Sequence, residues 1–290
     1  MASVTVFDQY RNLLFSIAYR ILGSAADAED AVQDSWLKWS AADRSKVADP
    51  KAYLVRIVSN TALDRLRAAS ARRETYLGPW LPEPILTSGE VPDVAPALLL
   101  VLENLTPLER AVFVLREAFA FSYDEIAEAV ERTPESVRQT AHRAREHVRA
   151  RRPRFPADRD RQRAVTERFF AAATGGDINT LMELLAPDVT LWTDGGGKVR
   201  QAMRPVHGAE RVATWLAGVG SRPYEGVRPD QMSAALVELN GGAGVVFSGA
   251  GRVIATITLD LDDDGRVAAI LNTANPDKLA AIRSGVVHSL

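Results

Sequence analysis

Three helix starts lie close together between residues 106 and 136, and they constrain the fold more than any other feature of the sequence. Thr106-Pro107-Leu108-Glu109 and Ser122-Tyr123-Asp124-Glu125 are capping boxes, in which a hydroxyl and a glutamate three residues later each accept a backbone N–H. Thr133-Pro134 supplies a third cap, with proline at the first helical position. We therefore predict helices that begin near residues 107, 123 and 134, the last two joined by a tight turn.

The helix expected from residue 134 is rich in arginine. Between Val137 and Arg154 there are seven arginines and a single acid, Glu146. Two short helices joined tightly, the second one basic, are typical of a helix-turn-helix, whose second helix enters the major groove. A solvated basic helix in a bundle is the alternative, and the two capped helices ahead of it favour the DNA-binding interpretation. The residues expected to face DNA are Glu135, Ser136, Arg138, Gln139, His142, Arg143 and Arg145.

The first 75 residues also have a helical pattern. Apolar residues recur at spacings of three and four over residues 10–21 and 28–39. Gly23 is expected to end the first helix and Ser24 to cap the second. A third helix is expected from Asp49-Pro50, and it runs into a second arginine cluster. The members of that cluster are Arg65, Arg67, Arg72 and Arg73.

Prolines and glycines over residues 77–96 cannot continue a helix, so this stretch is predicted to be a linker. Beyond residue 156 the pattern changes to runs rich in β-branched residues, separated by glycine and aspartate turns. Strands are expected at 189–193, 234–238, 243–248, 253–261 and 267–273, with helices near 160–173, 178–185 and 209–218. The predicted domains are an all-α domain at 1–76, the linker 77–96, an all-α helix-turn-helix domain at 97–154 and an α+β domain at 157–290.

Composition excludes several classes of protein. The chain has no cysteine, which excludes disulfides and thiolate zinc sites and is consistent with a reducing cytoplasm. A hydrophobic content of 47% excludes wholesale disorder. No apolar run approaches the roughly 18 residues of a membrane span, and the N-terminus lacks the pattern of a signal peptide. We therefore expect a cytoplasmic protein without membrane contact.

Several segments resemble the extracytoplasmic-function (ECF) bacterial sigma factors. Residues 105–116, 121–128 and 136–146 resemble the family's −35-reading domain. Residues 27–37 resemble its helix that docks on the polymerase clamp, and residues 52–67 resemble its −10-reading segment. The resemblance implies a sigma factor that binds core RNA polymerase and promoter DNA, is not an enzyme, and needs no cofactor or metal. One departure is the turn Val130-Glu131-Arg132, which lacks the usual glycine.

The resemblance also assigns roles to individual residues. Asn60 would contact an unstacked −10 base, Asp64 would lie near the same pocket, and the arginines 65, 67, 72 and 73 would hold phosphates of the opened strand. By pattern alone, a helix-surface or capping role is the better interpretation of Asn60. The polymerase-binding face would comprise Asp27, Glu29, Asp30, Val32, Asp34 and Trp36, although the same pattern suits a plain amphipathic surface helix.

Three further motifs resemble the ECF subgroup that carries a SnoaL-like C-terminal domain. That resemblance implies an NTF2-like cone for residues 157–290, a curved sheet wrapped by helices around a pocket. It also implies that this domain regulates the sigma factor in cis, and we expect the linker to pack against it. The motif residues are Trp80, Leu81, Pro82, Glu83 and Pro84; Asp194, Gly195, Gly196, Gly197 and Lys198; and Asn275, Pro276, Asp277, Lys278 and Leu279.

Other interpretations stay open at the level of sequence. A cone could bind an unknown small molecule, or catalyse acid–base chemistry with Asp188, Trp192, Asp194 or His207. Asp194 beside three glycines is explained equally well by a turn. The whole chain could also be a ligand-responsive helix-turn-helix regulator that works without polymerase, or a SnoaL-like or ketosteroid-isomerase-like enzyme with a helical adaptor.

Overall fold

The computed structural model describes residues 2–88, 96–150, 159–220 and 222–289, and the side chains of residues 2–5, 44, 70–74, 96, 97 and 220 are not described. The chain forms two compact units. The first unit comprises residues 1–75, 98–152 and 288–290, so it contains both helical regions. The second comprises residues 76–97 and 153–287, so it contains the predicted linker as well as the α+β domain.

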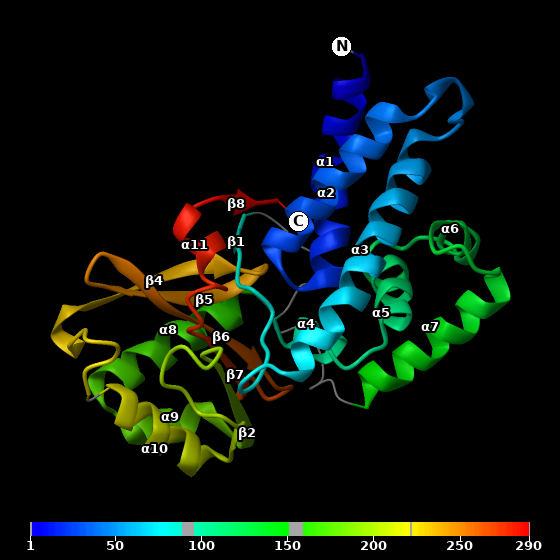
Figure 1. Ribbon diagram of the computed structural model, residues 1–290. Helices are drawn as coiled ribbons and strands as arrows, with labels where there is room; N and C mark the ends of the chain where they lie inside the picture. The colour runs from blue at the N-terminus through cyan, green and yellow to red at the C-terminus, as the bar shows by residue number, and fades with distance from the viewer. Residues whose placement is uncertain (1, 89–95, 151–158, 221, 290) are drawn as a thin grey trace. The chain divides into compact units, whose positions relative to one another are not determined.

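The first helical region packs three long helices against one another (Figure 1). Apolar residues at helical spacing, such as Leu14, Ile17 and Ile21, are fully buried between them. Gly23 ends the first helix as predicted, and the hydroxyl of Ser24 accepts the N–H of Asp27 to cap the second. The elements are α1 (Ala2–Leu22), α2 (Ala25–Ala41), the short 3-10 helix η1 (Arg44–Lys46) and α3 (Pro50–Glu74).

The second helical region confirms the three predicted helix starts. Thr106 and Ser122 each form a complete capping box, and Thr133 accepts the N–H of Ser136 at 3.3 Å. Helix α5 continues directly into a π-helical turn, which the sequence pattern did not predict. The elements are α4 (Pro96–Leu102), α5 (Pro107–Phe113), the π-helix η2 (Val114–Ala118), α6 (Tyr123–Ala129) and α7 (Pro134–Arg149).

The α+β domain is built on a sheet with the strand order β3-β2-β7-β6-β5-β4-β1-β8. Strands β4 to β7 are antiparallel neighbours, while β2 lies parallel to β7. The predicted strands are all present. The bounds are β1 (Leu86–Thr87), β2 (Leu185–Asp194), β3 (Val206–His207), β4 (Met232–Leu239), β5 (Gly242–Gly249), β6 (Arg252–Leu261), β7 (Val267–Thr273) and β8 (Val287–His288).

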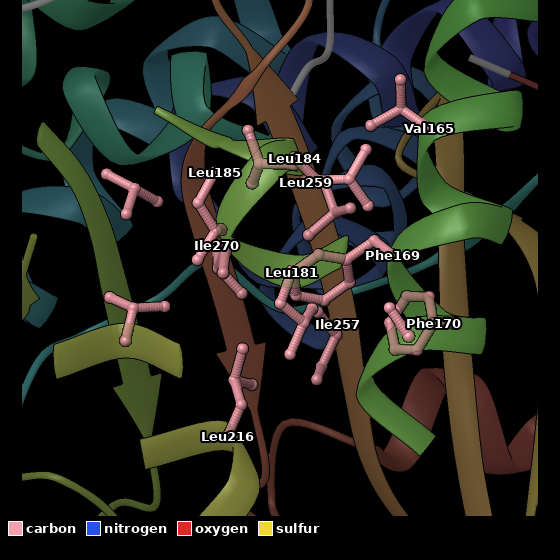
Figure 2. Packing of buried hydrophobic residues seen from close by; sticks show 14 of the residues in the cluster. Val165, Phe169, Phe170, Leu181, Leu184, Leu185, Leu216, Ile257, Leu259 and Ile270 are labelled. Atoms are coloured by element: carbon pink, nitrogen blue, oxygen red, sulfur yellow. The ribbon is translucent and has the colours of Figure 1, made fainter. Parts of the chain in front are cut away.

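Three helices cover one face of this sheet, as the NTF2-like arrangement requires (Figures 1 and 2). They are α8 (Arg159–Gly175), α9 (Ile178–Leu184) and α10 (Ala209–Gly220), and the remaining short elements are η3 (Pro229–Gln231) and α11 (Ala280–Ser284). Phe169 of α8, Leu181 of α9 and Ile270 of β7 belong to one buried cluster. The α+β class is thus confirmed. The sequence pattern missed β1, β3, β8 and α11 because such short elements complete no hydrophobic period.

Candidate nucleic-acid interface and motif junction

Helix α7 has one buried and one exposed face. Val137, Ala141 and Ala144 are buried because they recur on one face at spacings of three and four. The opposite face exposes most of the residues that the sequence assigned to the −35 duplex. Exposed there are Glu135, Arg138, Gln139, His142 and Arg143, while Ser136 and Arg145 are half-buried.

Arg145 is held by one acid and one aromatic residue within its own unit. Its Nε lies 2.9 Å from Glu117 and its Nη2 lies 3.2 Å from the Tyr123 hydroxyl. The hydrogen bond to Tyr123 and the contact with Glu117 raise the pKa of Arg145. Arg145 therefore fixes α7 against its neighbours, whereas Arg138, whose guanidinium lies 5.7 Å from the Tyr123 ring centroid, remains exposed.

The turn before α7 lacks glycine, and a glutamate takes the conformation that glycine would usually adopt. Glu131 has φ of 55°, in the left-handed region. The turn is closed by the N–H of Val130 on the Ile126 carbonyl and the N–H of Arg132 on the Ala127 carbonyl, both at 2.9 Å. The tight helix-turn-helix therefore forms despite the departure from the family pattern.

The residues assigned to the −10 strand lie along α3. Asn60 is half-buried, and its Nδ2 lies 3.4 Å from Oε1 of Glu131 in the helix-turn-helix turn. Asp64 is exposed and pairs with Arg67 at 3.0 Å. The side chains of Arg72 and Arg73 lie outside the described residues.

Arg65 connects the residues proposed for the −10 strand with the residues proposed for polymerase binding. Its guanidinium lies 2.7 Å from Asp34 and 3.2 Å from Asp30 of α2. The hydrogen bond to Asp34 is the main reason that the pKa of Arg65 is raised. A proposed phosphate ligand is thus paired with two proposed polymerase-binding carboxylates, an arrangement that the sequence pattern did not reveal.

Glu29, Val32 and Trp36 of the proposed polymerase face line a surface groove between α1 and α2. Trp36 is half-buried and packs edge-on against Phe7, with ring centroids 5.1 Å apart. Glu29 pairs with Arg11 at 2.6 Å, and Val32 is buried beneath them. The backbone N–H of Asp27 is capped by Ser24, so Asp27 contributes to the start of α2.

In the second unit, the structure brings the three motifs together around the carboxylate of Asp194, which is fully buried at the end of β2. Its Oδ2 accepts the N–H of Leu81 at 2.9 Å and the ammonium of Lys278 at 2.7 Å. Its Oδ1 accepts the Tyr76 hydroxyl and the N–H of Gly196, the latter at 3.1 Å. We call Tyr76, Trp80, Leu81, Asp194, Asn275 and Lys278 the motif junction.

Lys278 is as enclosed as the carboxylate it pairs with. Its side chain is 4% exposed, and its ammonium also donates to the carbonyl of Leu81. The Nζ lies 3.3 Å from the ring centroid of Trp80 and 4.9 Å from that of Tyr76. Aromatic faces stabilise a desolvated cation, so Tyr76 and the linker residue Trp80 both help to hold this ammonium.

Glycine is required after Asp194 because other groups of the domain lie too close to the backbone for a side chain to fit. A Cβ on Gly196, which has φ of +59°, would lie 2.3 Å from Nδ2 of Asn275. That amide donates to the Tyr76 hydroxyl at 2.8 Å, so a side chain at residue 196 would displace it. Outside the junction, Lys198 and Asp277 form a 2.5 Å ion pair at the surface.

The remaining motif residues support the junction. Pro82, Pro84 and Leu279 are buried, while Glu83 and Pro276 are half-buried. Tyr76 was missed by the sequence interpretation, and its position directly ahead of the glycine-proline stretch was the only available signal. Burial and the hydrogen bond to Asp194 raise its pKa far above the ordinary value of 10.0.

The residues considered for acid–base catalysis are not gathered at a cavity. The apolar cavity of the α+β domain is lined by described residues that include none of Asp188, Trp192, Asp194 and His207. Asp194 belongs to the motif junction, and Asp188 and His207 are exposed. Among the described residues there is no cluster of side chains that could hold a metal ion, and no described helix is long and apolar enough to cross a membrane.

Each of the two helical regions matches a known protein family, and known proteins match most of the chain. Residues 6–72 match the family Sigma-70 region 2, and residues 96–148 match the family Sigma-70, region 4. The ECF RNA polymerase sigma factor SigJ of Mycobacterium tuberculosis (strain ATCC 25618 / H37Rv) is 39% identical over 95% of this chain and 92% of its own length. The probable ECF RNA polymerase sigma factor SigI of Mycobacterium tuberculosis (strain CDC 1551 / Oshkosh) is 33% identical over 74% of this chain and 76% of its own length.

A solved structure extends this similarity to the fold. The crystal structure of Mycobacterium tuberculosis extracytoplasmic function sigma factor SigJ matches with a TM-score of 0.77 and 34% identity, over 96% of this chain and 98% of that chain. These similarities favour a sigma factor over a regulator that works without polymerase and over an enzyme with a helical adaptor. The chain therefore belongs to the ECF RNA polymerase sigma factors, which bind core RNA polymerase and promoter DNA to direct transcription initiation.

Proposed function

We propose that α7 reads the −35 duplex, that Asn60 and its neighbours on α3 bind the −10 strand, and that the free protein holds these two surfaces in a closed arrangement. The observation that carries this proposal is the contact between Asn60 and Glu131, which joins the −10-reading helix to the helix-turn-helix turn. A −10 base would have to replace Glu131 at the amide of Asn60.

Packing within the first unit supports the closed arrangement, and the distance between the two promoter elements requires this arrangement to open. Helix α3 packs against α5 and α6 within the first unit, and the ammonium of Lys51 lies 5.4 Å from the ring centroid of Phe121. The −10 and −35 elements lie about 25 base pairs apart, which is about 85 Å of duplex at about 3.4 Å per base pair. Surfaces that touch one another cannot occupy both elements at once, so the two helical regions must separate at a promoter.

We infer that the C-terminal domain regulates this separation through the linker. An unattached linker of residues 77–96 could span about 70 Å at about 3.5 Å per residue. Residues 76–87, however, are tied to the C-terminal domain by the motif junction and by β1, which pairs with β4. At most residues 88–95 then remain to lengthen the connection between the two helical regions, and their contour length is about 28 Å. The motif junction therefore favours the closed arrangement.

Chemical cross-linking can test whether the closed arrangement must open. Lys51 and Glu128 are exposed and line one pocket between α3 and α6, and neither is a proposed DNA ligand. The chain has no cysteine of its own, so a short bismaleimide would join only the pair introduced by Lys51→Cys and Glu128→Cys. The cross-linked protein should bind core polymerase and fail to form an open complex. The same variant treated with a monofunctional maleimide is the control, and equal open-complex formation by both would refute the closed arrangement.

A matched pair of lysines can test regulation by the junction. Lys278→Met removes the enclosed ammonium, whereas Lys198→Met removes a surface ion pair in a neighbouring motif. The first variant should change promoter-dependent transcription and lower the yield of the α3–α6 cross-link, and the second should leave both near wild type. If both variants match wild type in transcription and cross-linking, the junction has no regulatory role.

We also propose that the C-terminal domain binds a small molecule. The observation in favour is a cavity of about 360 Å³ in the α+β domain, within the range of roughly 300–1,000 Å³ that is common for ligand sites. Binding of any small organic probe that is lost when the cavity is filled by mutation would support this function.

A further inference from the structure

The two helical regions of the first unit meet at a pair of buried arginines, one from each region. Arg110 of α5 is 1% exposed, and it is among the largest side chains that the described part of the chain buries completely. Arg20, in the last turn of α1, is 3% exposed. Arginine is almost never fully buried unless its charge is paired or hydrogen-bonded, so the contacts of these two side chains show what holds them there.

Arg110 caps the C-terminal end of α1. Its Nε donates to the carbonyl of Arg20 at 3.1 Å. The last four carbonyls of a helix have no N–H partner within the helix, and they carry the negative end of its dipole. A guanidinium is therefore a favourable cap at this position. Here the cap comes from the other helical region, 90 residues further along the chain.

Glu103 holds the guanidinium of Arg110 in position. Its Oε1 accepts Nη1 of Arg110 at 2.7 Å, and the two side chains are 10% and 1% exposed. Glu103 directly follows α4, so this ion pair lies within the second helical region and can persist when the two regions separate. The Nη2 of Arg110 is buried and has no hydrogen-bond partner among the described residues. Separation would give this nitrogen access to water, so the contact between the regions can be released reversibly.

Arg20 makes the contact between the regions reciprocal. Its Cζ lies 4.6 Å from the ring centroid of Phe119, which directly follows the π-helical turn η2 of the second region. The attraction between a cation and an aromatic ring is stronger where water is excluded. Arg20 therefore offers its carbonyl to Arg110 and its guanidinium to Phe119, and both partners belong to the other region.

We propose that Arg20, Arg110 and Phe119 form a latch that holds the two helical regions of the free protein closed, with Arg110 as its central residue. Only the open protein can occupy both promoter elements, so the latch sets the share of molecules that are ready to bind a promoter. The latch deepens the proposed closed arrangement and rests on it.

Thiol protection can measure how often the two regions separate in the full-length protein. Val55 of α3 is 3% exposed and lines the pocket between α3 and α6, so the thiol introduced by Val55→Cys should react with a maleimide only when the regions separate. Ala31 of α2 is buried where α2 packs against α1 and α3, so Ala31→Cys reports unfolding of the first region instead. The chain has no cysteine of its own, so each variant has a single thiol.

The central contact is best removed as a neutral pair, by Arg110→Met together with Glu103→Gln. Arg110→Met alone would leave the enclosed carboxylate of Glu103 without this partner. The double variant should raise the labelling rate of the Val55→Cys thiol about tenfold, the lower end of what a hydrogen bond from a charged group contributes. The labelling rate of the Ala31→Cys thiol should stay near that of the parent protein.

Two controls isolate the contact between the regions. Glu103→Gln alone keeps the hydrogen bond from Arg110 to the carbonyl of α1, so it should leave labelling near the parent rate. Arg116→Met removes an arginine of similar surroundings, whose Nη1 donates to the carbonyl of Phe121 at 2.8 Å and whose Cζ lies 4.7 Å from the ring centroid of Tyr123. All of these contacts lie within the second region, so Arg116→Met should not accelerate labelling either.

The outcomes separate failure of the latch from failure of the closed arrangement. If the Val55→Cys thiol of the parent protein reacts as fast as in urea-unfolded protein, the regions are not closed and both proposals are wrong. If that thiol is protected, and the double variant accelerates neither thiol or accelerates both equally, the closed arrangement stands and the latch is wrong. Should the double variant fail to fold, Phe119→Leu removes the ring beside Arg20 and should accelerate labelling at Val55→Cys alone; unchanged labelling would then overturn the latch.

Discussion

Asp194 and Lys278 form an ion pair that is sealed from solvent, with Oδ2 and Nζ 2.7 Å apart and side-chain exposures of 0% and 4%. Burying two charges is costly, and it is tolerated when every remaining lone pair and proton finds a partner. Here Leu81 of the linker provides such partners through its N–H and carbonyl, and Tyr76, directly ahead of the linker, provides another through its hydroxyl. The pair therefore couples the stability of the C-terminal domain to the position of the linker.

Removing one member of this pair should destabilise the protein strongly. Asp194→Asn or Lys278→Met leaves the other charge buried and unpaired, which we expect to lower the free energy of unfolding by about 3–5 kcal/mol. Chemical denaturation, followed through the unfolding transition of the second unit, measures this loss of free energy. The surface pair offers the control, because Asp277→Asn should cost less than about 1 kcal/mol. Losses of equal size at the two sites would contradict the prediction.

Tyr76 should resist ionisation and make the junction sensitive to alkali. Its folded-state pKa is raised above the ordinary 10.0, first by burial and then by Asp194, so the fold favours the neutral phenol. This contribution to stability is complete below pH 10 and is lost as the pH rises from 10 towards the raised pKa. The difference in tyrosinate absorbance between wild type and Tyr76→Phe should show no Tyr76 ionisation near pH 10 while the protein is folded. Wild type should also lose stability above pH 10 more steeply than the variant, and parallel pH curves would count against this account.

Substitution of Gly196, whose backbone N–H donates to Asp194 of the motif junction, should be far more harmful than substitution of a glycine in open space. Gly196→Ala places a Cβ 2.3 Å from the Asn275 amide at a positive φ, which alone costs about 1–2 kcal/mol. Gly218→Ala lies in α10 with no atom within 4 Å of the added Cβ, so it should be neutral or stabilising by about 0.5–1 kcal/mol. Thermal unfolding of the two variants measures the contrast, and similar midpoints would mean that the glycine turn is not constrained.

The exposed face of α7 should determine −35 specificity. Arg138→Ala and Arg143→Ala should weaken binding to a cognate −35 duplex, and a true base reader should lose about 1–3 kcal/mol of discrimination at one position. Arg149, which is exposed in the last turn and pairs with Glu146, is the control because it should affect affinity without specificity. Fluorescence anisotropy with single-base-substituted duplexes distinguishes the two effects. Unchanged affinity of both variants at moderate salt would remove them from the interface.

Asn60 should act at the melting step. Asn60→Ala should bind core polymerase normally and form open complexes slowly, and a premelted template should restore much of the activity. Glu131→Ala removes the partner of Asn60 without touching the amide, so it should melt the promoter at least as fast as wild type. Permanganate footprinting follows both variants over time. If Asn60→Ala melts duplex promoter at the wild-type rate, then Asn60 is structural only.

The sequence alone determined the features that depend on neighbours along the chain. Capping residues such as Thr106 and Ser122 satisfy backbone groups three residues away, so the helix starts were readable directly. The face of α7 followed from helical periodicity, and the strands of the sheet followed from runs of β-branched residues between turns. The family resemblance then identified the three motifs, but not what their side chains contact.

Only the tertiary structure decided which distant groups meet. Tyr76 and Asp194 are 118 residues apart, and Asn60 and Glu131 are 71 residues apart, so no local pattern could pair them. The pairing of Arg65 with Asp30 and Asp34, assigned by sequence to different partners, likewise depends on how α2 and α3 pack. Hydrogen bonds and ion pairs act over a few ångströms in space, whereas sequence periodicity describes only the path of the chain, so the contacts that define these sites arise when the chain is packed.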